Sequence, residues 1–386
     1  MQLRFWMILT LLISLNYFHN SNVKAIDSIY PQPDFQKGFS FIGWGESEFR
    51  DERALESLQR LKETGTEWVV LCIFWFQENK SSTEIQPAYD LYSVNTTDVL
   101  LFIEIIHDLG LKVVLKPIVD IKTGEWRAYI EPSEEWFEEY SSYISFWAEI
   151  AEQKAVELFV VGCELINTES YLDEWLNIIG DVKAFYSGPL VYSATYDSYQ
   201  NIEFWDELDF IGVNAYYTLT YSTVPTLKEL KRGWQKYLTE LEDFSFSLTK
   251  DIIFTEIGYR SIDGCNIQPW NWQKKGRLDE NEQALCYEAT FEVFNNISWL
   301  KGFYWWNWEA IYTDEDKKNY TPQEKLAEKV LKSWYINSTP YPLNDNQKIW
   351  TIILTISISL LISVVVTTII LRKNILNKRE LEKGGN

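Results

Sequence analysis

Residues 111–164 open with the run LKVVLKPIVD (111–120), close with LFVVGCE (158–164), and carry a helix-like segment between them at 133–154. Both runs are apolar and rich in β-branched residues, with little alternation between apolar and polar positions. This pattern is typical of strands that are buried on both faces of a sheet. Strand, helix and strand in this order predict a crossover unit with two parallel strands.

The same unit recurs on both sides of this stretch. Further strand-like runs are GFSFIGW (38–44), WVVLCIFW (68–75), PLVYSAT (189–195), LDFIGVNAYY (208–217), DIIFTEIGY (251–259) and KGFYWWNW (301–308). Leu55, Leu58 and Leu61 share one face of a helix-like segment that stops near Gly65, and a similar segment runs from Val99 to Leu109, before Gly110. Further helix-like segments cover 170–186, 226–243 and 279–297. Eight such units in about 300 residues predict an α/β fold, a (β/α)8 TIM barrel. The alternative, an open doubly wound sheet, would require a Gly-rich phosphate turn after an early strand, and the chain has none there.

The two ends of the chain carry targeting patterns. Residues 1–25 combine a basic start, an apolar stretch and the small-x-small site Val23-Lys24-Ala25, which predicts a signal peptide. Residues 349–371 are apolar and uncharged, which predicts a transmembrane helix, and the basic tail at 372–386 is expected in the cytoplasm. We therefore expect a single-pass type I membrane protein whose catalytic domain, residues 26–340, is extracellular or lumenal. The polar tail argues against a GPI signal.

Composition excludes several classes of function. With 35 Lys and Arg against 56 Asp and Glu, the formal net charge is −21, which disfavours nucleic acid as a partner. The chain has 2 histidines, so a His-rich metal site is not expected, and we predict no metal and no organic cofactor. Carboxylates remain as the groups for proton transfer. An aromatic content of 16% suits a large core, a sugar-binding cleft, or both, and we expect a monomer that meets the membrane only through its C-terminal helix.

In an exported domain, sequons can be N-glycosylated and cysteines can form disulfides. Candidate N-glycosylation sites are Asn79, Asn95, Asn296, Asn319 and Asn337. Cys265 and Cys286 lie in or beside one loop region, so a disulfide between them is possible. Cys72 and Cys163 lie within strand-like runs and are expected to be buried thiols.

Function in a barrel of this kind lies at the carboxyl ends of the strands. The fourth strand ends at Glu164 and the seventh at Glu256, so these two glutamates are predicted to face each other across the barrel mouth. Retaining glycoside hydrolysis uses two carboxyl groups about 5–5.5 Å apart, one as general acid and one as nucleophile. Salt-bridged strand ends are the structural alternative for each glutamate taken singly.

The surrounding motifs resemble clan A glycoside hydrolases, and in particular family 113, the β-mannanase-like barrels. They are KGFSFIGW, WVVLCIFWFQ, KPIVDIKTGEWRAYI, VGCEL, LDFIGVNAYY, FTEIGYRS and GFYWWNWE, which occur in that order over residues 37–335. The resemblance implies that Glu164 is the acid/base and Glu256 the nucleophile. It also implies that Tyr216 or Tyr217 donates a hydrogen bond to the nucleophile, and that Trp306 forms a platform under the reacting sugar.

Other positions of the motifs imply substrate contacts. Asp120, Trp126 and Arg127 match a substrate-side loop, and Trp44 and Trp75 are expected to line the cleft. Cys163 is a departure, because clan A enzymes usually have Asn before the acid/base, where its amide contacts the sugar 2-hydroxyl. A thiol is a weak hydrogen-bond partner.

Three functions remain open at this stage. The first is a retaining β-glycoside hydrolase acting on a β-linked polysaccharide or oligosaccharide, β-1,4-mannanase-like by resemblance. The second is a weakly active or inactive glycan-binding ectodomain, which Cys163 favours. The third is a transglycosylase that uses the same two glutamates with a sugar as acceptor.

Overall fold

Eight parallel strands close into a barrel in which β8 pairs with β1. The computed structural model describes residues 34–294 and 296–343. The strands are β1 (Gln36–Ile42), β2 (Trp68–Gln77), β3 (Lys112–Ile121), β4 (Leu158–Cys163), β5 (Leu190–Thr195), β6 (Phe210–Asn214), β7 (Ile252–Ile257) and β8 (Leu300–Glu309). Their order around the barrel follows the chain, which confirms the predicted TIM barrel.

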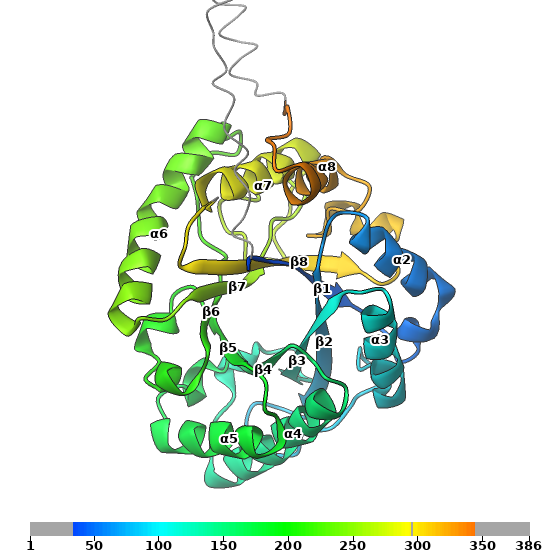
Figure 1. Cartoon of the computed structure of the whole chain (residues 1–386), viewed down its shortest axis with the longest axis vertical. Helices are drawn as coiled ribbons and strands as arrows, with labels where there is room; N and C mark the ends of the chain where they lie inside the picture. The colour runs from blue at the N-terminus through cyan, green and yellow to red at the C-terminus, as the bar shows by residue number, and fades with distance from the viewer. Residues whose placement is uncertain (1–33, 295, 344–386) are drawn as a thin grey trace, which may run out of the picture.

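Helices surround the barrel on its outside (Figure 1). They are α2 (Glu52–Lys62), α3 (Thr96–Asp108), α4 (Glu134–Gln153), α5 (Leu172–Phe185), α6 (Leu227–Leu248), α7 (Glu280–Phe294) and α8 (Leu326–Lys332). Short helices lie in the connections: η1 (Glu48–Arg50), η2 (Arg127–Tyr129), η3 (Ile166–Thr168), η4 (Tyr199–Asn201), η5 (Phe204–Glu207), η6 (Asp314–Lys318) and the π-turn η7 (Ser333–Asn337). The crossover from β5 to β6 uses η4 and η5 in place of an α-helix.

The helix ends follow the capping residues in the sequence. Ser133 caps α4 by accepting a hydrogen bond from the backbone N–H of Trp136, and Thr226 and Glu229 form a capping box at the start of α6. α6 runs to Leu248, beyond the predicted end at residue 243, and stops where Thr249 adopts a left-handed conformation. α8 was not predicted from the sequence.

Strand residues alternate between two cores. Tyr304 points into the barrel, where it packs with the inner core of residues such as Val114, Ile118 and Val160. Its neighbour Trp305 points outward and stacks on Tyr287 of α7, with ring centroids 3.8 Å apart. A side chain's place in a strand therefore decides whether it can reach the barrel mouth at all.

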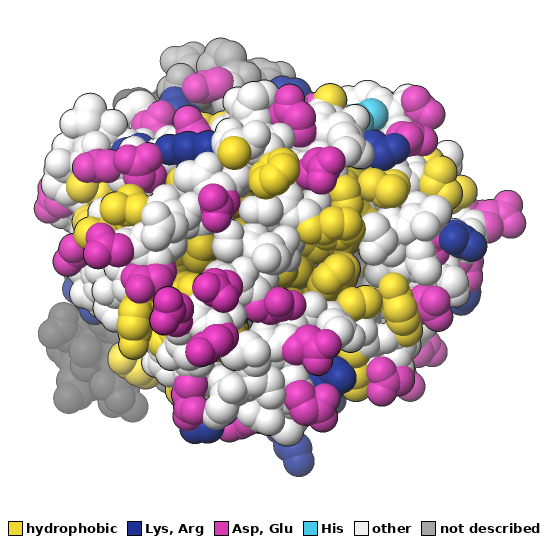
Figure 2. Space-filling view, turned by 90° about the horizontal axis from the view of Figure 1, so that it is seen from below, with side chains coloured by type: hydrophobic (Ala, Val, Ile, Leu, Met, Phe, Trp, Pro, Cys, Tyr) yellow, Lys and Arg dark blue, Asp and Glu magenta, His cyan; other side chains and the backbone are white. Residues whose placement is uncertain are grey.

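Three sequence predictions fall outside the described residues: the signal peptide (1–25), the transmembrane helix (349–371) and the basic tail (372–386). Within residues 34–294 and 296–343, none of the helices has the length and apolar character needed to span a bilayer. Figure 2 shows acidic side chains spread over one side of the molecule, as the net charge of −21 leads one to expect.

Candidate active site

The carboxyl ends of β4 and β7 bring Glu164 and Glu256 into one site. Cys163 closes β4, and its sulfur lies 3.9 Å from Oε1 of Glu256, while Glu164 follows directly in the chain. The charge of Glu256 acts on Glu164 strongly enough to help raise the pKa of Glu164. The two carboxyl groups are therefore electrostatically coupled across the barrel mouth.

Glu256 is held by a cation and a phenol. Lys116 donates from Nζ to Oε1 at 2.5 Å, and the hydroxyl of Tyr216 donates to Oε2 at 2.8 Å. The side chains of Lys116 and Glu256 are 0% and 7% exposed, so this ion pair lies out of contact with bulk water. Both oxygens of the carboxylate thus accept hydrogen bonds from donors that favour its charged form.

Glu164 has a different environment. Its backbone φ is +54°, in the left-handed region that residues other than Gly rarely adopt. Its side chain is 13% exposed. Oε2 accepts hydrogen bonds from the indole of Trp126 at 3.0 Å and from Arg127 at 3.3 Å. Burial and the charge of Glu256 raise the pKa of Glu164, against the lowering effects of Arg127, Asn214 and Trp126.

Asn214, at the end of β6, supplies an amide beside Glu164. Its Nδ2 donates to Oε1 of Glu164 at 2.8 Å and lies 3.9 Å from the sulfur of Cys163. The hydroxyls of Ser193 and Thr255 both donate to Oδ1 of Asn214, at 2.8 and 2.9 Å. These two donors fix the orientation of the amide, so that its N–H group is directed at Glu164.

Side chains on the β1 to β3 side of the barrel mouth connect to the carboxyl group of Glu164. Arg127, which contacts Glu164, also donates to Asp120 at 2.8 Å, and Asp120 accepts from the hydroxyl of Tyr92 at 2.9 Å. The ring of Tyr92 packs edge-on against Trp44, with centroids 5.5 Å apart. Trp44 is 42% exposed, so it presents an open aromatic face at the mouth.

A third buried carboxyl group holds Trp44 in place. Glu309, at the end of β8, accepts from Nε1 of Trp44 at 2.6 Å and from the amide of Asn307 at 2.9 Å. Burial raises the pKa of Glu309 to about 7. Trp306, three residues earlier in β8, is half-buried against the inner core, so its ring lies on the barrel side of the strand.

Two predicted site residues lie elsewhere, because the strand alternation directs them outward. Trp75 packs against Tyr143 and Trp147 of α4, so the prediction that it lines the cleft is wrong. Tyr217 stacks on Tyr237 of α6 with centroids 4.2 Å apart, so Tyr216 is the tyrosine that contacts Glu256.

The cysteines and sequons were also located. The sulfurs of Cys265 and Cys286 are 3.9 Å apart, which is contact between two buried thiols and not the disulfide considered from the sequence, since a disulfide bond is about 2.05 Å long. Asn79, Asn296 and Asn337 are exposed, whereas Asn95 and Asn319 are half-buried. Glycosylation at all five positions stays a prediction.

The part of the chain that the structure describes holds no group of three or more His, Cys, Asp or Glu arranged for a metal ion.

A family model supplies the identification. The model described as Glycoside Hydrolase Family 113 matches residues 38–325, which include both glutamates and all eight strands in whole or in part. The chain belongs to this family. It is therefore a glycoside hydrolase by family, as the ordered motifs predicted.

Solved structures agree with the family assignment. A GH113 β-1,4-mannanase, solved as a complex, is 33% identical, with a TM-score of 0.71 over 78% of this chain and 98% of that chain. The GH113 β-mannanase of Alicyclobacillus acidocaldarius in complex with ManMIm is 27% identical, with a TM-score of 0.71 over 79% and 98%. A Ruminococcus gnavus β-glucuronidase, 14% identical with a TM-score of 0.56 over 79% and 50%, shares the fold alone. No curated protein matches the chain.

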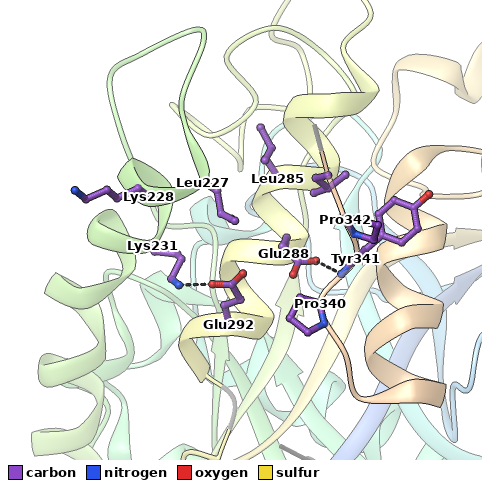
Figure 3. A pocket seen from close by; sticks show the side chains of 10 residues that line it. Leu227, Lys228, Lys231, Leu285, Glu288, Glu292, Pro340, Tyr341 and Pro342 are labelled. Carbon is purple, nitrogen blue, oxygen red and sulfur yellow. Dashed lines mark hydrogen bonds and ion pairs between the residues drawn. The ribbon is translucent and has the colours of Figure 1, made fainter. Parts of the chain in front are cut away.

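A separate hollow lies on the outside of this family 113 barrel, between α6, α7 and the segment after η7 (Figure 3). It has a volume of about 460 Å³, and its lining includes Lys231, Glu288, Glu292 and Tyr341. Glu288 accepts hydrogen bonds from the Trp334 indole at 3.1 Å and from the Tyr341 backbone at 3.3 Å. Glu164 and Glu256 do not line it, so it is not the site of the chemistry described above.

Sequence reasoning missed three residues of the site. Lys116 was quoted only as part of an apolar run, although a lysine in the middle of a fully buried strand requires a partner and is therefore a signal. Asn214 lies two residues before Tyr216, and it is likewise a polar residue within a buried strand that requires a partner. Glu309 directly follows the last motif tryptophan, Trp308, and ends β8.

Proposed function

We propose that this chain hydrolyses β-linked mannan with retention of anomeric configuration, using Glu164 as acid/base and Glu256 as nucleophile. The observation that carries the proposal is the unequal treatment of the two carboxyl groups. Glu256 accepts hydrogen bonds from Lys116 and Tyr216 on its two oxygens, which favours the charged form that attacks. Glu164 has a raised pKa, which favours the protonated form that donates.

In the first step, Glu164 gives its proton to the glycosidic oxygen while an oxygen of Glu256 attacks the anomeric carbon. The bond between that carbon and the leaving oxygen breaks, and a glycosyl ester of Glu256 forms. The attacking carboxylate loses its negative charge as the ester forms. The ionised Glu164 that results is stabilised by Asn214, Trp126 and Arg127.

In the second step, the carboxylate of Glu164 removes a proton from water, and the water oxygen attacks the anomeric carbon. The ester bond breaks, Glu256 returns to its carboxylate form, and Glu164 is protonated again. Burial alone would lower the pKa of Lys116, but in the resting site that pKa is raised overall, and the charge of its hydrogen-bonded partner Glu256 is one of the causes. Lys116 thereby stabilises the departing carboxylate of Glu256.

The substrate class is supported by the relatives, whose structures are described as those of a β-1,4-mannanase and of a β-mannanase. The aromatic surfaces of Trp44 and Trp306 suit the C–H faces of pyranose rings. The test is to incubate the full chain with β-mannan, β-glucan and xylan oligosaccharides and to follow the first products by NMR. Release of β-anomeric sugar from mannan supports the proposal; initial release of α-anomeric sugar, or cleavage of the other glycans alone, overturns it.

We also propose that the barrel acts outside the cytosol on a single C-terminal anchor. The proposal rests on the sequence patterns of residues 1–25, 349–371 and 372–386. Protease added outside intact cells, or outside vesicles of the matching orientation for a lumenal barrel, should degrade the barrel and spare the tail. Digestion of the tail with protection of the barrel would show the inverted topology.

A further inference from the structure

We infer that Glu169, a buried carboxyl group in the loop after β4, is a positioning residue for Glu164 and acts through the hydroxyl of Tyr192. The inference rests on the proposed function and deepens it, because it assigns the placement of the acid/base to two buried residues outside the catalytic pair. The link is the peptide group that follows Glu164, whose N–H belongs to Leu165.

The backbone of Glu164 has to be held in place. Its φ of +54° occurs where β4 ends and the chain turns into η3, and residues other than Gly keep this conformation only where their surroundings enforce it. The N–H of Glu164 donates to the carbonyl of Ser193 in β5 at 2.9 Å, which fixes the preceding peptide group. Leu165 is 1% exposed, so the N–H of the following peptide group needs a partner other than bulk water.

Tyr192, in β5, supplies that partner. Its hydroxyl oxygen accepts from the N–H of Leu165 at 2.9 Å and donates its proton to Oε1 of Glu169 at 2.9 Å. A phenol has one proton to donate. Because that proton is committed to Glu169, a lone pair of the oxygen is left for the N–H of Leu165. Glu169 therefore sets the direction of the hydroxyl that holds the peptide group after Glu164.

The ring of Tyr192 is fixed by its packing. A Cβ atom added at Gly162 would lie 2.7 Å from the ring, so a glycine in β4 is what allows the ring to lie against that strand. The ring also packs edge-on against Trp175 and Phe204, with centroids 5.1 and 5.4 Å apart. A ring held on these sides keeps its hydroxyl in one place, and the hydroxyl then determines where the Leu165 peptide group lies.

Glu169 is a costly residue in this location. It is 6% exposed, and burial raises its pKa to about 7. A buried carboxyl group destabilises a fold unless hydrogen bonds compensate for the lost water. Both its protonated and its ionised forms have an oxygen that can accept from Tyr192, so the link is kept on either side of that pKa.

The position of Glu164 matters because its partners belong to other parts of the barrel. Asn214, at the end of β6, and Trp126, in the loop after β3, donate to its two carboxyl oxygens at 2.8 and 3.0 Å. A rotation of the Glu164 backbone would move the carboxyl group away from both donors and from the leaving oxygen. A misplacement of about 1 Å can slow a reaction by roughly 10²-fold. The loss should fall on proton transfer, because Glu256 is held separately on β7.

The test compares kcat/KM of the full chain for a mannotetraose and for an activated aryl β-mannoside. This ratio reports the steps up to the glycosyl ester, in which only the tetraose needs a proton for its leaving oxygen. Tyr192→Phe should lower kcat/KM for the tetraose roughly tenfold to a hundredfold and leave the aryl value within about threefold. The matched control is Tyr140→Phe, because Tyr140 is equally buried and donates to the carbonyl of Val161 in the same strand. It should leave both values within about twofold.

Variants of Glu169 test whether the carboxyl group acts through Tyr192. Glu169→Ala should show the same substrate dependence as Tyr192→Phe, and the two changes together should cost about as much as one, since they break one chain of contacts. Glu169→Gln keeps an oxygen for Tyr192 and should recover most of the activity that Glu169→Ala loses. Four results would overturn the inference: no loss for the tetraose, equal loss for both substrates, the same pattern in Tyr140→Phe, or additive losses in the double variant.

Failure of the proposed function has a separate readout. A parent chain that cleaves neither substrate would overturn that function, and hydrogen exchange at the Leu165 amide, followed by mass spectrometry, would still test the contact. Tyr192→Phe and Glu169→Ala should speed this exchange by roughly tenfold or more, and Tyr140→Phe should not. Unchanged exchange in the first two variants would show that Glu169 and Tyr192 do not hold the peptide group after Glu164.

Discussion

The ends of β4 and β7 each carry one glutamate, and the two ends are built differently. Around Glu256 the barrel supplies a full cation, Lys116, and a phenol, Tyr216, in a setting that is almost closed to water. Around Glu164 it supplies two neutral donors and an arginine that Glu164 shares with Asp120. Glu164 is also the more exposed of the two and has a left-handed backbone.

The difference shows how one fold assigns two tasks to one residue type. A carboxylate whose two oxygens accept hydrogen bonds from a buried cation and a phenol is held in one orientation, which suits a nucleophile. A carboxyl group whose pKa is raised by burial and by its neighbour's charge can hold a proton, and the donors around it then stabilise the anion that it becomes. Changes at each end should therefore have different effects.

The largest effect is expected from Glu256→Ala. Without the attacking oxygen, turnover should fall by roughly 10⁴-fold or more on every substrate, whatever the leaving group. Steady-state rates on mannan oligosaccharides and on an activated aryl β-mannoside check this. If the variant keeps activity on the aryl substrate, Glu256 is not the nucleophile.

Glu164→Ala should separate substrates by leaving group. Mannan oligosaccharides, whose leaving oxygen needs a proton, should react about 10²–10⁴-fold more slowly. An activated aryl β-mannoside should keep its first step, which appears as a burst of released phenol followed by slow turnover. Equal losses on both substrates would argue that Glu164 does not act as the acid.

Lys116→Met tests the cation beneath the nucleophile. Removal of one partner of a buried ion pair costs about 3–5 kcal/mol in free energy of unfolding, because the other charge is left uncompensated. Denaturant unfolding at neutral pH measures this, and the activity of the folded variant should also fall. The control is Lys116→Met with Glu256→Gln, which removes both charges and should recover most of the stability. No recovery would mean that lost packing, and not charge, explains the effect.

Tyr216→Phe and Tyr217→Phe form a matched pair. Each change removes one hydroxyl from neighbouring residues, but only Tyr216 donates to Glu256. A hydrogen bond to a charged group is worth about 1.5–3 kcal/mol, so Tyr216→Phe should slow the second step, in which Glu256 regains its charge, and lower kcat roughly tenfold to a hundredfold through that step. Tyr217→Phe should leave kcat within about twofold. Equal effects would contradict the assignment of Tyr216.

The smallest effect is a shift in pH dependence. Arg127 lowers the pKa of Glu164, against the raising effects of burial and of Glu256. Because Glu164 acts in its protonated form, Arg127→Gln should raise that pKa and move the alkaline limb of kcat/KM to higher pH by roughly one unit. Arg277→Gln is the control, since Arg277 is 90% exposed and pairs with Asp263. A shift to lower pH would contradict the account.

Much of this fold could be predicted because its signals are local. Apolar strand runs, helix caps and Gly-terminated helices each depend on a few neighbouring residues, and together they specify the order of the eight units. The two glutamates were found because both end strands of a barrel, where position alone implies proximity. The length of α6 was missed because its last residues follow tertiary packing more than any stop signal in the sequence.

The parts of the site that were missed depend on contacts between distant strands. Lys116 and Glu256 are 140 positions apart, and nothing near Lys116 in the sequence names its partner. Trp75 was expected in the cleft, and Tyr217 was an alternative to Tyr216 beside the nucleophile, because both lie near strand ends. A shift of one position in a strand, however, reverses the direction of a side chain. The choice between Tyr216 and Tyr217 required the register that only the closed barrel supplies.

The assignment of the two glutamates is tested most directly by the anomeric configuration of azide products. With an activated aryl β-mannoside and added azide, Glu164→Ala should give a β-glycosyl azide, because azide attacks the ester intermediate from the face that Glu164 occupied. Glu256→Ala should give an α-glycosyl azide, because azide replaces the missing carboxylate on the opposite face. NMR of the two products reads both outcomes. The reverse pair of anomers would contradict the roles assigned here to Glu164 and Glu256.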